Sequence, residues 1–104
     1  MALRVNSVRK TVATPGSPVA INVSLKNVVM AWITALPTNT KPVCIGASNV
    51  LATPGSENGA LLTPGAMMCI NAGMSNEGGL LDLTSLYVDA EVANEGVSVM
   101  LLRQ

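Results

Sequence analysis

The chain has 104 residues, 49% of them hydrophobic and 12% charged, and its formal net charge is zero. This length favours a single domain around one hydrophobic core. The six basic residues have only one Trp and one Tyr for aromatic company, which argues against a nucleic-acid-binding surface.

The charged fraction is about half of the roughly 25% found in an average soluble domain. A free monomer with so little charge would expose apolar patches, and such patches usually mark surfaces that another protein covers. The composition therefore predicts a protein that assembles with further copies or partners. The alternative is a neutral globule whose uncharged residues are Ser, Thr and Asn.

The N-terminal segment Met1–Lys10 is basic and sparsely apolar. It has no apolar stretch behind its charges, so we expect no secretory signal. We predict an N-terminal arm or edge strand over residues 1–10, ahead of a single β-sandwich domain over residues 11–104. Arg4, Arg9 and Lys10 are its candidate contacts with a neighbouring molecule. As an arm, the segment would be needed for assembly and dispensable for folding.

The motif Thr-Pro-Gly occurs three times, at residues 14–16, 53–55 and 63–65, and its first two copies lie within a repeated ATPGS. Proline presets φ at the second position of a β-turn, and glycine at the third position accepts the positive φ of type II. Each motif therefore predicts a type II turn between strands. The flanking residues do not match at a fixed period, which favours recurrent turn chemistry over duplication.

Apolar and polar residues alternate over Val19–Leu25, which predicts a half-buried strand. Val28–Ala35 is apolar on both faces and predicts a central strand, with Trp32 packed in the core. It also contains the longest apolar run, which is far shorter than the about 18 residues of a membrane-spanning helix. The further predicted strands are Val43–Gly46, Ala60–Leu62, Ala66–Asn71, Leu80–Leu83, Leu86–Glu91 and Val97–Leu102, with a loop over Gly73–Gly79.

About eight short strands with frequent turn signals, and no sustained helical periodicity, predict an all-β protein. The expected fold is a jelly-roll-like β-sandwich of about eight short antiparallel strands. Five of the six basic residues lie in the first half of the chain, and all six acids lie in the second. The molecule would then have a positive and a negative side, unless strands of the two halves interleave.

The sequence offers little for catalysis or metal binding. It contains no His, and Cys44 and Cys69 alone do not complete a zinc site. Buried, reduced thiols are the favoured state of the two cysteines, although a disulfide between them stays open. We predict no enzyme, no catalytic residue, no cofactor and no metal.

Other polar groups favour structural interpretations. Asp89 and Glu91 point to one face of a strand near Asp82, and we expect a solvated or intersubunit charged face rather than an acid–base pair or a Ca²⁺ site. Asn22-Val23-Ser24 matches the N-glycosylation pattern by chance, because it lies within a predicted strand. The six methionines are predicted to fill gaps in the core or in an interface.

Three short patterns carry a resemblance. VCIGASNV, at residues 43–50, has the form V-x-I-G-x-S-x-V, Leu62–Gly65 has the form L-x-P-G before a strand, and Leu86–Ala90 has the form L-Y-V-x-A before the final strand. This layout covers about Val43–Leu102, together with the strand around Trp32. It resembles that of small bacteriophage virion proteins of β-sandwich fold, among them decoration, or cement, proteins and parts of necks, tails and fibres.

The resemblance implies a structural role and identifies no site residues. It implies a homo-oligomer, expected to be a homotrimer, that binds the outside of a phage capsid across junctions of the major capsid protein and stabilises the shell. The alternative is a tail, neck or fibre-base protein of the phage particle. Either protein would be made in the host bacterial cytoplasm and reside in the virion, without direct contact to nucleic acid or membrane.

A surface glycan-binding module is a weaker alternative. Trp32 and Tyr87 could line a small ligand groove, as aromatic side chains do in sugar-binding proteins. Core packing is the favoured interpretation for Trp32, because it lies inside the most apolar run of the chain.

Overall fold

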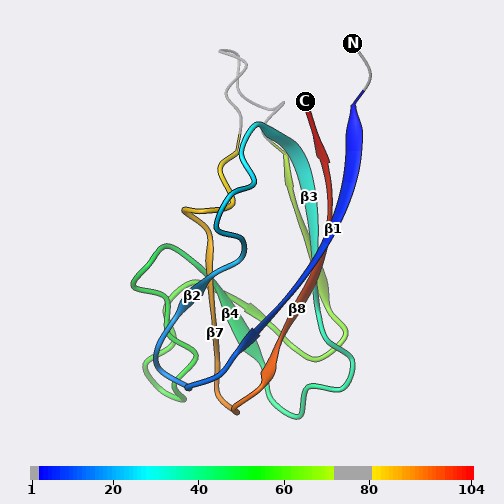
Figure 1. Cartoon of the computed structure of the whole chain (residues 1–104). Coiled ribbons are helices and arrows are strands. Elements are labelled where there is room, and N and C mark those ends of the chain that lie inside the picture. The colour runs from blue at the N-terminus through cyan, green and yellow to red at the C-terminus, as the bar shows by residue number, and fades with distance from the viewer. Residues whose placement is uncertain (1–2, 72–80) are drawn as a thin grey trace.

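The computed structural model describes residues 3–71 and 81–104 (Figure 1). These residues form two antiparallel sheets of four strands each, and none of them lies in a helix. It follows that no helix of the described part is long and apolar enough to cross a bilayer. The strands are β1 (Arg4–Val12), β2 (Val19–Ala20), β3 (Val28–Ala35), β4 (Val43–Gly46), β5 (Ala60–Leu62), β6 (Met67–Asn71), β7 (Tyr87–Ala90) and β8 (Glu95–Arg103).

The strand order defines the topology. The first sheet has the order β1-β8-β3-β6 and the second has the order β2-β7-β4-β5. Consecutive strands change sheet at every step except β4 to β5, which pair with each other. This arrangement is that of a jelly-roll β-sandwich and confirms the predicted fold class. Because each sheet mixes early and late strands, the basic and acidic halves of the chain interleave.

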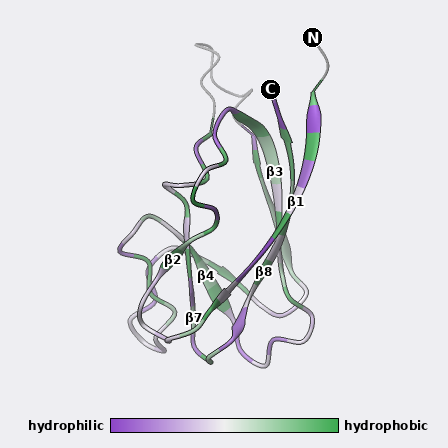
Figure 2. Ribbon diagram, viewed as in Figure 1, coloured by the Kyte–Doolittle hydropathy of each residue, from purple (hydrophilic) through white to green (hydrophobic). Residues whose placement is uncertain are grey.

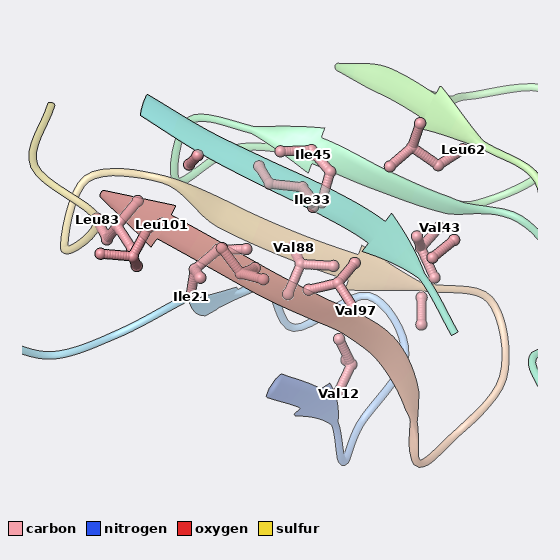
Figure 3. Close-up of a cluster of buried hydrophobic side chains, with 14 of the residues drawn as sticks. Val12, Ile21, Ile33, Val43, Ile45, Leu62, Leu83, Val88, Val97 and Leu101 are labelled. Carbon is pink, nitrogen blue, oxygen red and sulfur yellow. The ribbon is translucent and has the colours of Figure 1, made fainter. Parts of the chain in front are cut away.

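The hydrophobic core lies between the two sheets (Figure 3). Side chains alternate along each strand, so every second residue of β8 points inward, and Val97, Val99 and Leu101 are at most 1% exposed. The buried core consists of Val12, Ile21, Val28, Ala31, Ile33, Ala35, Val43, Ile45, Leu62, Leu83, Val88, Ala90, Val97, Val99 and Leu101.

β1 is an edge strand of the first sheet. It pairs with β8 over its whole length, from Arg4 opposite Arg103 to Val12 opposite Glu95. Val8 and Val12 pack against the core. Of the two forms predicted for residues 1–10, Arg4–Lys10 has that of a strand, which continues to Val12.

The three Thr-Pro-Gly motifs form the predicted type II turns. Their glycines have φ values of 85°, 81° and 81° in chain order. In each turn the amide that follows the glycine donates a hydrogen bond of 2.9 to 3.0 Å to the threonine carbonyl. Positive φ at the third position together with this hydrogen bond defines a type II turn, so the prediction is confirmed.

The strand predicted over Val19–Leu25 is wrong beyond Ala20. The Asn22 Oδ1 accepts hydrogen bonds from the amides of Ser24 and Leu25, at 2.8 and 2.9 Å, and closes a turn in place of a sheet ladder. Val23 is 82% exposed at this turn. The Asn-Val-Ser motif therefore lies in an exposed turn and not in a strand.

The other predicted strands agree with the structure to varying degrees. Val28–Ala35, Val43–Gly46 and Ala60–Leu62 have the predicted bounds, while β6, β7 and β8 differ from their predictions by one or two residues at one or both ends. In the predicted strand Leu80–Leu83, Leu81 forms one isolated bridge with Val28, and a turn follows. Leu80 and the predicted loop Gly73–Gly79 lie outside the described residues.

Candidate interaction surface

The outer face of the second sheet is partly covered by the chain itself. The segment 47–58 between β4 and β5 folds over this face, and Leu51 and Asn58 form a bridge within it. Cys44, Val50 and Ala52 are buried there as a second small cluster, against which Tyr87 packs. This sheet therefore has apolar contacts on both faces.

Asp89 lies within this covered face and is fully buried. Its carboxylate accepts hydrogen bonds from the amide of Gly16 at 3.0 Å and from the amide of Ala52 at 2.8 Å. It thereby ties together the two ATPGS segments, to which these residues belong. The predicted solvated or intersubunit face is wrong for Asp89, because its carboxylate is buried. The sequence gives no sign of the distant amides that bind it.

Glu95, at the start of β8, is the second buried carboxylate. It accepts hydrogen bonds from the Thr40 amide at 2.7 Å, the Thr40 hydroxyl at 2.9 Å and the Lys41 amide at 3.3 Å. Burial alone would raise the pKa of Glu95, but the hydrogen bonds from Thr40 and Lys41 together hold this pKa below its ordinary value. The carboxylate is therefore a structural anchor for the loop after β3.

Asp82 has a local role of its own. Its carboxylate accepts hydrogen bonds from the hydroxyl and the amide of Thr84, and these lower its pKa. Its described hydrogen bonds are all local, whereas those of Asp89 reach Gly16 and Ala52. Among the described residues, no three His, Cys, Asp or Glu side chains form a group that could hold a metal ion.

The two cysteines are free and lie in different sheets. Cys44 is buried in β4, and its burial, followed by the nearby charges of Glu57 and Asp89, raises the pKa of its thiol. Cys69 is exposed in β6 of the first sheet. No disulfide joins Cys44 to Cys69 in the structure, and the predicted burial holds for Cys44 and is wrong for Cys69.

The outer face of the first sheet differs sharply from that of the second sheet. Alternation along the four strands turns away from the core a set of side chains of which about half are apolar and only one is charged. We name this set the apolar outer face: Val5, Ser7, Arg9 and Thr11 of β1, Met30, Trp32 and Thr34 of β3, Met67, Cys69 and Asn71 of β6, and Ser98, Met100 and Leu102 of β8. Figure 2 shows hydrophobic residues along much of β3, in the middle of this sheet.

The strand register places large apolar side chains at the centre of the apolar outer face. Trp32 lies directly opposite Met100 on one side and Cys69 on the other. Val5, Met67 and Met100 are 63%, 61% and 47% exposed. This sheet is thus buried on one face and presents apolar side chains to solvent on the other.

The prediction that Trp32 lies in the core is wrong. Its neighbours Ala31 and Ile33 take inward positions of β3 and are fully buried. Trp32 points to the opposite side, where it is half-buried among its cross-strand neighbours. A run that is apolar on both faces does not reveal which of its faces meets the core.

The predicted contact residues of the N-terminal segment do not come together. Arg9 belongs to the apolar outer face, whereas alternation directs Arg4 and Lys10 to the other side of β1. The sequence also did not identify Val5, Met67 or Met100 as members of one surface. The available signal was the abundance of methionine, which is predicted to serve the core or an interface.

Trp32 and Tyr87 do not share a groove. Trp32 points outward from the first sheet, whereas Tyr87 packs beneath the segment that covers the second sheet. The two aromatic side chains therefore lie on opposite sides of the sandwich.

Fold and surface together define a class: a jelly-roll β-sandwich with one sheet partly covered by its own chain and one sheet exposing an apolar face. Searches against protein families, curated proteins and solved structures found no match to the chain.

Proposed function

We propose that this chain is a structural protein of a bacteriophage particle, which binds the outside of the capsid and stabilises the shell. The observation that carries this proposal is the apolar outer face, with Val5, Met67 and Met100 between 47% and 63% exposed. Exposed apolar patches of this kind mark surfaces that another protein covers. A protein built to be completed by neighbours suits a particle made of many contacting subunits.

The fold supports the same role. Jelly rolls are frequent among viral capsid and lectin domains, although a fold alone does not determine function. Two sheets packed around a continuous core resist deformation, because protein interiors are close-packed. Each copy adds only a modest net contact energy after association costs, but the contacts multiply over a shell with many identical positions.

The proposal is tested with particles of the encoding phage assembled without this protein. Added protein should bind at a fixed ratio to the major capsid protein and raise the temperature at which the shell ruptures. Absence of binding, or binding without a change in rupture temperature, would contradict a shell-stabilising role. Electron microscopy of labelled virions gives the position, and label at the tail, neck or fibre base would assign the protein to those structures.

A further inference from the structure

We propose that a second copy of this chain packs on the apolar outer face, sheet against sheet, about a two-fold axis. This inference deepens the proposed function: it names a second copy as the protein that covers this face, so the dimer would bind the shell through its other surfaces. The four strands that carry the face belong to one continuous sheet, so the surface is formed by rigid elements rather than by loops.

The side chains of the apolar outer face have the composition of a protein interface. Trp32, Met30, Met67 and Met100 lie in its outward positions, and Arg9 stands at one margin. Aromatic residues, Met and Arg are enriched in interfaces, whereas Lys, Glu, Asp, Ser and Ala are depleted. This face contains none of the three depleted charged types and no Ala, and its two depleted residues are Ser7 and Ser98.

The distribution of charge argues against a partner that is recognised by charge and permits a second copy. Arg9 is the one charged residue among the outward side chains, and it lies on the edge strand β1. Partners that recognise each other by charge place several complementary charges across the contact. A face with a single marginal charge offers no such pattern, but it can contact its own copy without opposing like charges.

A two-fold axis parallel to the strands, between β8 and β3, gives a specific arrangement. It lays β1 of one copy over β6 of the other, so the two Arg9 side chains stand at opposite margins, about 14 Å apart across three strand spacings. It also lays Met100 of each copy over Trp32 of the other, because these residues are direct neighbours in the register. Sulfur–aromatic contacts of this kind are favourable.

The area comes close to the lower limit for a specific contact. Strands of nine, nine, eight and five residues give roughly 500 Å² of sheet in each copy. Two copies thus bring about 1,000 Å² of flat sheet area together, and the projecting side chains add to the surface that is buried. Specific interfaces begin at about 1,200 Å². Packed sheets of β-sandwiches use the same geometry, with about 10 Å between the sheets.

This arrangement closes at two copies, because the same patch is used by both partners. Three copies, the number expected from the resemblance, would need a contact between two different surfaces of the chain. The second sheet offers less for a contact of either kind, since the segment 47–58 already packs on its outer face.

The test measures self-association by sedimentation velocity, with a substitution on the face and a matched control. Met100→Lys places a charge at the centre of the apolar outer face, where Met100 is 47% exposed. Leu61→Lys makes the same change at a residue of the second sheet that is 50% exposed. Circular dichroism verifies that both variants fold.

The wild-type protein and Leu61→Lys should form dimers at micromolar concentration, and Met100→Lys should raise the dissociation constant about 100-fold or more. A wild-type monomer at about 200 μM, a trimer, or an unchanged dimer of folded Met100→Lys would each overturn the proposal. Since these measurements use no capsid, they can fail while shell binding succeeds, and the reverse also holds.

Cys69 reports on the location of the contact. In the wild type, its alkylation should slow as the concentration rises above the dissociation constant, because the second copy covers β6. In Met100→Lys, the rate should stay fast at all these concentrations. The buried Cys44 is an internal control that should react slowly in both proteins. A rate for Cys69 that does not change as wild-type dimers form would overturn the placement of the contact on this face.

Discussion

Asp89 and Glu95 are buried carboxylates that accept hydrogen bonds from segments distant in sequence. Gly16 and Asp89 are 73 positions apart, and Thr40 and Glu95 are 55 positions apart. Burying a carboxylate is costly unless hydrogen bonds replace its lost hydration. Each of these two side chains therefore holds loops against the sandwich through hydrogen bonds to their backbone amides.

Replacing Asp89 should destabilise the fold. Asp89→Ala leaves the amides of Gly16 and Ala52 without their acceptor, and the buried Ala52 amide alone should then cost about 1 to 3 kcal/mol. Asp89→Asn should also lower the free energy of unfolding, because one of its two oxygen acceptors becomes a donor. Urea denaturation measures both effects. Glu91→Gln, two residues away, is the control and should change the free energy of unfolding by less than about 0.5 kcal/mol.

Glu95 should make stability depend on acid pH. Its pKa is lowered in the folded protein, so its contribution is complete above the unfolded-state pKa of about 4.3 and is lost as the pH falls through the folded-state pKa. The difference in unfolding free energy between the wild type and Glu95→Gln should therefore shrink between about pH 5 and pH 2.

Urea denaturation of both proteins across that range gives the measurement. Thr40→Val removes the hydroxyl donor and keeps both backbone donors, so it should reduce the pH dependence only in part. A difference between wild type and Glu95→Gln that stays constant over the range would contradict the role of the carboxylate.

At the scale of elements, the sequence predicted the features that depend on local chemistry. The Thr-Pro-Gly turns follow from the φ preferences of Pro and Gly, and the bounds of β3, β4 and β5 follow from apolar runs between turn residues. The Asn22 turn was missed because apolar and polar residues alternate there as they do in a strand. In the structure, the Asn22 side chain accepts hydrogen bonds from two backbone amides and forms a turn. Such a competition is settled by local hydrogen bonds and not by periodicity.

The candidate surface could be predicted only in kind. The low charged fraction indicated that the protein has an apolar surface for a partner. The position of that surface depends on which face of β3 meets the core. That choice depends on the pairing of β3 with β8 and β6, which brings Met100 and Cys69 beside Trp32. These contacts join distant parts of the chain, so no local pattern contains them.

Two glycines of the connection between β4 and β5 should differ in their tolerance of substitution. Gly55 has a φ of 81°, and the space that a Cβ would occupy there is open, so Gly55→Ala should cost about 1 to 2 kcal/mol from backbone strain alone. At Gly59, with a φ of 115°, a Cβ would also lie 2.6 Å from the Ile45 carbonyl oxygen and 2.7 Å from a Val50 methyl. Gly59→Ala should therefore lower the free energy of unfolding clearly more than Gly55→Ala in urea denaturation, and equal losses would contradict the close packing of this connection.

At the scale of the whole molecule, the two edges of the first sheet are unequal. β1 has nine residues and pairs with β8 throughout, whereas β6 has five residues. The contact between β1 and β8 is close, because a Cβ on Gly96 would collide with the backbone carbonyl of Lys10. The start of β1 and the end of β8 lie side by side, so this strand pair holds the two ends of the described chain together (Figure 1).

Deleting Met1–Lys10 tests whether this segment serves folding or only assembly. The deletion removes all but two residues of β1, together with Val8, which packs on the core. It also leaves most of β8 as a long edge strand whose exposed backbone can pair with other chains. We therefore expect a lower midpoint of urea denaturation and concentration-dependent aggregation. Removing only Ala2 and Leu3, ahead of β1, is the control and should leave the midpoint unchanged, whereas an equally stable, soluble product of the longer deletion would show that the sandwich does not depend on β1.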